Sequence, residues 1–81
     1  MVKADKTLAR MRANPRDWAI DDLKVIARRY NIDWLQPGTS HVTFSFPGLM
    51  PLTVPAHRPV KPIYVTRFLA LLDSIGEQDD D

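Results

Sequence analysis

Two histidines, His41 and His57, are the residues of this chain best suited to moving protons. An imidazole changes its charge near neutral pH, so its neutral form accepts a proton from a hydroxyl group. Cations of the kind that hold phosphate groups, among them Arg58 and Lys61, lie close in sequence. The residue types allow acid–base chemistry at a hydroxyl beside a phosphate, although an exposed histidine is more often a plain polar surface residue.

The chain lacks the residues that most other kinds of catalysis or metal binding need. The chain contains no cysteine, which excludes disulfides and thiolate metal sites, and its two histidines are too few for a zinc site. Its three glycines are scattered, and no serine lies in a nucleophile motif. No metal and no cofactor are therefore expected. Cleavage of RNA is the reaction that the residues still allow: a histidine accepts the proton of the 2′-hydroxyl next to the scissile phosphate.

The composition indicates one small globular domain. The 81 residues are 44% hydrophobic and 26% charged. No apolar run approaches the roughly 18 residues of a membrane span, and no apolar signal segment begins the chain. Because the absence of cysteine suits a reducing compartment, a cytoplasmic protein without membrane contact is expected.

The charges are distributed unevenly. The net charge is +1, but four of the ten acidic residues lie in the last five positions, so eleven Lys and Arg stand against six acids up to Gly76. A basic body favours a polyanionic partner, because cations that neutralise phosphates release condensed counterions. A solvated surface of mixed charge is the alternative interpretation. Residues 77–81 are expected to form a disordered acidic tail.

Helical periodicity predicts three helices. The first covers residues 3–13 and ends before a proline. The second covers residues 20–30, with acids in its first turn and arginines in its last, as the helix dipole favours. The third runs from residue 61 or 62 to residue 75, with Gly76 as its C-terminal cap.

Three strands are expected between the last two helices, at residues 32–36, 41–46 and 50–54. In the second strand, apolar residues that face the core alternate with polar ones that face solvent. Residues 47–49 as a loop place apolar residues opposite one another, in the pairs Phe46–Met50, Phe44–Leu52 and Val42–Val54. This register also pairs the polar residues Thr43 and Thr53, and it places His41 opposite Pro55.

These elements predict an α+β fold. A three-stranded antiparallel sheet carries two helices on one face and leaves the other face wet. This domain covers residues 19–76, a helical extension covers residues 1–18, and the acidic tail follows at 77–81. His41 belongs to the wet face or its rim, and His57 lies just beyond the third strand.

Two short motifs give the chain a family resemblance. Gly-Thr-Ser-His at 38–41 leads into the second strand, and Val-Pro-Ala-His at 54–57 leaves the third. With Lys61 and the flanking helices in the same order, they resemble the HicA toxin family over about residues 20–75. The order and spacing of the motifs are more specific than either motif alone.

The resemblance implies a fold like that of a double-stranded-RNA-binding domain. It also implies a type II toxin that acts as a metal-independent endoribonuclease on mRNA and is blocked by a HicB-type antitoxin protein. His41 is then the general base, while Gly38 forms a tight turn and Thr39 or Ser40 binds phosphate or orients the imidazole. Ordinary turn formation explains residues 38–40 as well. The residues expected to contact RNA or phosphate are Gly38, Thr39, Ser40, His57, Arg58, Lys61 and Arg67.

The chain departs from the family pattern in three ways. About 18 residues precede the core helix, serine stands before His41 where many relatives have histidine, and the acidic tail is extra. The general acid is therefore open between His57, Lys61 and a water, and His57 has the alternative role of a polar residue at the strand exit. The alternative functions are a non-catalytic RNA-binding module, or inactive relative of the same fold, and a subunit that only binds its partner.

Overall fold

The computed structural model describes residues 3–38 and 40–79, and it confirms an α+β fold with a three-stranded antiparallel sheet. The elements, in chain order, are α1 (Lys3–Ala13), α2 (Ile20–Arg29), β1 (Asp33–Leu35), β2 (His41–Ser45), β3 (Leu52–Pro55) and α3 (Pro62–Asp79). All the predicted helices and strands are present, and most of their ends differ from the prediction by at most two residues.

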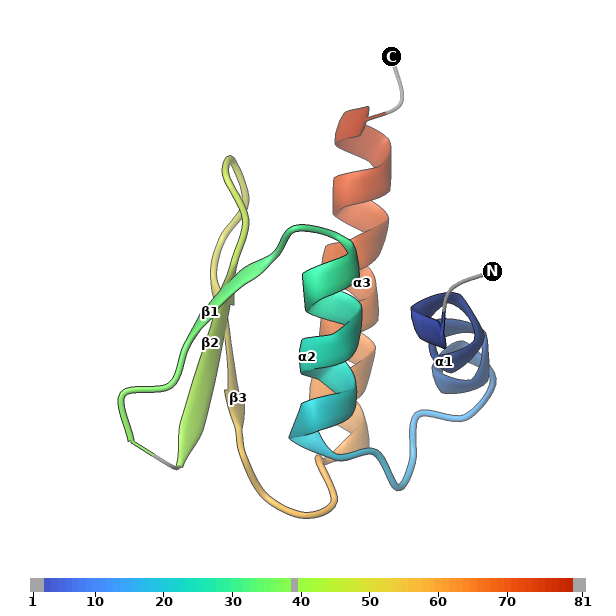
Figure 1. The fold of residues 1–81 in the computed structure, drawn as a ribbon, viewed down its shortest axis with the longest axis vertical. Coiled ribbons are helices and arrows are strands. Elements are labelled where there is room, and N and C mark those ends of the chain that lie inside the picture. The colour runs from blue at the N-terminus through green and yellow to red at the C-terminus, as the bar shows by residue number, and fades with distance from the viewer. Residues whose placement is uncertain (1–2, 39, 80–81) are drawn as a thin grey trace.

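The elements form three layers (Figure 1). The sheet is one outer layer, α2 and α3 cover one of its faces, and α1 lies on the far side of these two helices. No helix or strand of the described residues covers the other face of the sheet. The two-helix cover and the open face agree with the alternating pattern of the second predicted strand.

The central strand is β2, and its pairing with β3 has the register expected from the apolar pattern. The pairs are His41–Pro55, Val42–Val54, Thr43–Thr53 and Phe44–Leu52. On the open face, the hydroxyl oxygens of Thr43 and Thr53 are 3.0 Å apart. Because a shift of one residue would turn every apolar side chain of β2 outward, burial of one face specifies this register.

The connection between β2 and β3 is longer than the three-residue loop that was predicted. The ladder ends two residue pairs earlier, at Phe44–Leu52, so Phe46 and Met50 do not pair, and Met50 is 85% exposed. The predicted pair of Phe46 with Met50 is therefore wrong. The cause is local: Pro51 has no N–H for a ladder bond, and a turn with Gly48 at φ 85° fills the connection.

Most of the core lies between the sheet and the two covering helices, where Phe44 packs, and Met11 of α1 adds to it from the other side of these helices. The ring centroid of Phe44 is 5.1 Å from that of Phe68 in α3 and 6.3 Å from that of Trp34 in β1. Such tilted arrangements are favourable for aromatic rings. The buried apolar residues are Met11, Leu23, Ile26, Ala27, Ile32, Val42, Phe44, Val54, Val60, Val65, Phe68, Leu71, Leu72 and Ile75.

The third helix is longer than expected. It continues through Gly76 to Asp79, so the prediction of Gly76 as a C-terminal cap is wrong. Gly76 has no positive φ, and a Cβ atom there would meet nothing within 4 Å. Residues 77–79 of the expected disordered tail belong to this helix, and residues 80–81 lie outside the described residues.

Candidate functional site

Three loops meet at one end of the molecule, the lower end in Figure 1. They are the turn before β2, the loop at 56–61 between β3 and α3, and the connection at 14–19 between α1 and α2. The loop at 56–61 lies between the other two. Most of the predicted site residues lie in the first two loops, and none of them comes from the third.

Backbone hydrogen bonds join the loop at 56–61 to both neighbouring loops. The N–H of Ala56 donates to the carbonyl oxygen of Ser40 (2.7 Å), which continues the strand pairing one step past His41–Pro55. At the other end of the loop, the N–H of Val60 donates to the carbonyl oxygen of Trp18 (2.7 Å), as an isolated antiparallel bridge. The three loops are therefore held in fixed relation, rather than merely lying close together.

Both histidines lie at this end, and both are exposed. His41 is the first residue of β2 and shares the open face with Thr43, because residues two apart in a strand point to the same side. His57 follows two residues after Pro55, the partner of His41. The strand pairing thus brings the two histidine motifs of the sequence to the same corner of the sheet.

The same end carries exposed cations from two loops. Arg58 and Lys61 come from the loop at 56–61, as expected, and Arg16 comes from the connection at 14–19. Arg16 and Lys61 line one shallow pocket. Sequence reasoning did not single out Arg16, because only the Trp18–Val60 bridge brings it to this end.

The surroundings are mixed in charge. Asp17 lies between Arg16 and Trp18, and Asp21 and Asp22 lie in the first turn of α2. The carboxylate of Asp22 accepts a hydrogen bond from the N–H of Ala19 (3.0 Å) and so helps to begin that helix. A ligand at this end therefore meets acceptors as well as cations.

The remaining predicted site residues are placed differently. Arg67 lies in α3, where its guanidinium is 5.9 Å from the ring centroid of Tyr64, and it lines a groove with residues 49–52 of the hairpin connection. It is not part of the three-loop end. Gly38 is exposed, has no positive φ and has space for a Cβ atom, so its backbone does not require glycine. Thr39 lies outside the described residues.

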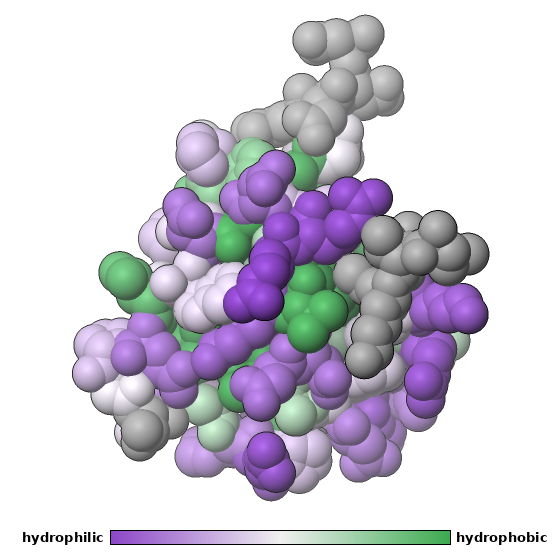
Figure 2. Space-filling view, viewed as in Figure 1, coloured by the Kyte–Doolittle hydropathy of each residue, from purple (hydrophilic) through white to green (hydrophobic). Residues whose placement is uncertain are grey.

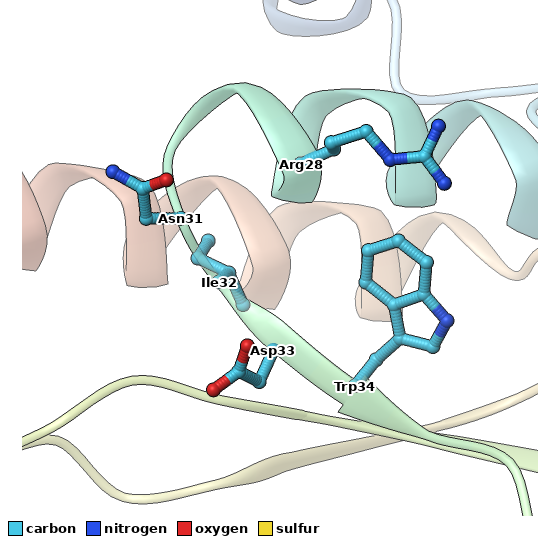
Figure 3. Close-up of a pocket in the computed structure, with 5 residues that line it drawn as sticks. All are labelled: Arg28, Asn31, Ile32, Asp33 and Trp34. Atoms are coloured by element: carbon cyan, nitrogen blue, oxygen red, sulfur yellow. The ribbon is translucent and has the colours of Figure 1, made fainter.

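A separate pocket lies between α2 and β1 (Figure 3). The guanidinium of Arg28 is 5.6 Å from the ring centroid of Trp34, a cation–π contact that holds the arginine over the indole. Asn31 and Asp33 line the same pocket, and the buried Ile32 lies between them. None of the predicted site residues reaches this pocket, so it offers a control for experiments at the three-loop end.

The face of the molecule drawn in Figure 2 is mainly polar. Figure 2 shows hydrophilic side chains gathered over the middle of the face seen in Figure 1, with separate hydrophobic patches between them.

Within residues 3–38 and 40–79, no three His, Cys, Asp or Glu side chains are grouped so that they could hold a metal ion. None of the described helices is both long and apolar enough to span a membrane.

Comparisons with known proteins identify no relative. No family model, no curated protein and no solved structure matches the chain. The functional argument therefore rests on the residues at the three-loop end.

Proposed function

We propose that this protein is an endoribonuclease toxin that cleaves mRNA at the end carrying His41 and His57. One observation carries the proposal: the pairing of β2 with β3 places Ser40 and His41 beside Pro55 and Ala56, so the ends of the Gly-Thr-Ser-His and Val-Pro-Ala-His motifs lie side by side. These are the motifs that resemble the HicA family. Their meeting in space supports a shared site, because the two segments are separated by the whole hairpin in sequence.

The reaction uses groups that this end supplies. His41 accepts the proton of a ribose 2′-hydroxyl, and the 2′-oxygen then forms a bond to the adjacent phosphorus. The bond from phosphorus to the 5′-oxygen breaks, and that oxygen takes a proton from an acid. The products are a 2′,3′-cyclic phosphate and a free 5′-hydroxyl, so no other reactant is consumed.

His57 is the acid that the strand pairing favours. It follows the partner of His41 by two residues, in the loop that directly continues β3, so both imidazoles lie at the same end of the β2–β3 pair and can act on one phosphodiester. Arg58 and Lys61 lie in the same loop and are exposed, which suits contact with the phosphate oxygens.

The biological partners follow from this activity. The substrate is mRNA, so the site of action is the cytoplasm. A toxin of this type also needs an antitoxin, and a HicB-type protein that covers the three-loop end would keep RNA away from His41.

The test is paired induction of the wild type and His41→Ala in a growing culture, followed by cleavage of RNA by the purified proteins. Loss of an acid–base group lowers the rate about 10²- to 10⁴-fold, so His41→Ala should leave growth and messages intact. Ser45→Ala, on the same open face but at the other end of β2, is the matched control and should remain toxic. Equal toxicity of the wild type and a folded His41→Ala variant would overturn the assignment.

The exposed cations also suit a second function, an RNA-binding module without catalysis. In that case purified protein binds RNA, the affinity falls steeply with salt, and the RNA stays intact. Recovery of cyclic-phosphate products that depend on His41 decides for the enzyme.

A further inference from the structure

We propose that a pocket between Trp18 and Pro59 binds one nucleobase of single-stranded RNA, with a preference for guanine. The pocket is lined by Asp17, Trp18, Ala19, Arg58 and Pro59, so it joins the connection at 14–19 to the loop at 56–61. It is an open depression on the surface, with a volume of about 390 Å³. This inference rests on the proposed function, because it assumes that RNA is the ligand of this end.

The walls of the pocket are already fixed. The carbonyl oxygen of Trp18 accepts the N–H of Val60 at 2.7 Å, and the indole N–H donates to the carbonyl oxygen of Asn14 at 2.6 Å. On the indole ring, the guanidinium of Arg10 lies 6.0 Å from the centroid. A ligand therefore meets an aromatic group whose position does not have to be ordered on binding, which lowers the cost of association.

The polar groups of the pocket are free to meet a ligand. Among the described residues, the side chains of Asp17 and Arg58 have no hydrogen-bond or ion-pair partner. Asp17 also has a positive φ of 65°, a conformation that is uncommon outside glycine and asparagine or aspartate. The pocket thus combines two flat apolar groups, one carboxylate that only accepts hydrogen bonds and one cation.

This combination fits guanine better than the other bases. Aromatic side chains stack on unpaired bases of RNA, whose Watson–Crick edges then take hydrogen bonds from the protein. The guanine edge presents two adjacent donors, N1–H and the N2 amino group, which match the two oxygens of one carboxylate. Adenine, cytosine and uracil do not present two adjacent donors on that edge.

A neighbouring pocket supplies the place for the phosphate. It is lined by Arg16, Lys61 and four further residues, and it shares Asp17 and Pro59 with the pocket of Trp18. A base in one pocket and its phosphate in the other describe a single nucleotide. Since His57 directly precedes Arg58, this nucleotide lies beside the proposed cleavage site and selects where the RNA is cut.

The experiment is a titration of the full chain with guanosine, adenosine, cytidine and uridine 5′-monophosphates, followed by the two indole N–H signals in ¹⁵N NMR spectra. These nucleotides have no phosphodiester next to the 2′-hydroxyl, so the protein cannot cleave them during the titration. We expect guanosine monophosphate to shift the Trp18 signal and to bind about five- to hundredfold tighter than the others, as for a bidentate base contact. The Trp34 signal, from the separate pocket, should stay in place.

Asp17→Asn tests the carboxylate without disturbing the fold, because asparagine tolerates a positive φ. It should remove most of the preference for guanine, while the matched variant Asp33→Asn, in the pocket of Trp34, should keep it. An unmoved Trp18 signal, equal affinity for the four nucleotides, or an unaltered preference in Asp17→Asn would overturn the proposal.

These outcomes are independent of the proposed catalysis. Selective binding of guanosine monophosphate by a protein that leaves RNA intact would support the pocket and overturn the enzyme. Cleavage that depends on His41, without any response of Trp18, would do the reverse.

Discussion

The position of a cation, rather than its presence in the sequence, decides whether it can serve the proposed site. Lys61 is exposed directly before α3, in the loop that also carries His57. Arg67 lies within α3 and has the same charge, yet its guanidinium lies over the ring of Tyr64 and next to the hairpin connection. The two residues should therefore differ in their contribution to RNA binding.

We expect Lys61→Gln to weaken the binding of single-stranded RNA and to reduce the slope of log K against log salt by about 0.7, the contribution of one phosphate contact. The measurement is a binding titration at several salt concentrations with an RNA that carries 2′-O-methyl groups and resists cleavage. Arg67→Gln is the matched control and should leave the slope close to that of the wild type. Equal effects of the two substitutions would contradict this assignment.

At the scale of elements, α3 continues past the glycine at which the sequence pattern predicts its end. Gly76 lies inside this helix, without a positive φ, and an added Cβ atom would meet nothing within 4 Å outside the helix's own backbone. Glycine within a helix costs about 0.5–1 kcal/mol relative to alanine, because it loses more backbone freedom on folding. Gly76 therefore weakens α3, although the backbone conformation at this position does not require glycine.

Gly76→Ala should raise the free energy of unfolding by about 0.5–1 kcal/mol, which a urea titration followed by circular dichroism can measure. The comparison is Gly48→Ala in the hairpin connection, where φ is 85° and a Cβ atom is strained. That variant should be less stable than the wild type. Destabilisation by Gly76→Ala would instead mean that the helix ends at Gly76, as a C-terminal cap.

At the scale of the whole molecule, α1 shares the core of the rest of the chain. Met11 is fully buried and belongs to the same apolar cluster as Phe44 and Phe68. The ion pair between Arg12 and Asp73 also links α1 to α3 at 2.8 Å, but the two side chains are 43% and 62% exposed. Burial of Met11, more than the surface ion pair, should hold this layer in place.

Met11→Ala should lower the free energy of unfolding by about 2–5 kcal/mol, the usual cost of removing a buried methionine side chain. Arg12→Ala should lower it by less than about 1 kcal/mol, because solvent screens exposed ion pairs. Both values come from denaturant titrations of the purified variants. Similar small effects of the two substitutions would show that α1 is only loosely attached.

Local patterns in the sequence determined the elements and one face of the sheet. The alternation in β2 together with a short connection to β3 was sufficient for the register, because a shift by one residue would turn the apolar residues of one strand away from the core. The helical spacing of apolar residues located the three helices, because it gives each helix one apolar face that can be buried. Their ends were less certain, as Gly76 and Met50 illustrate, since a single residue type allows more than one backbone conformation.

Tertiary structure alone decided which loops meet at the candidate site. Trp18 and Val60 are far apart in sequence, and no local pattern predicts the bridge that joins them. That bridge joins the connection between α1 and α2 to the loop before α3, and it brings Asp17 and Trp18 beside Arg58 and Lys61. The sequence by itself determined the two histidine motifs and the strands that carry them, whereas the pocket beside them exists only because long-range packing joins segments without a shared local signal.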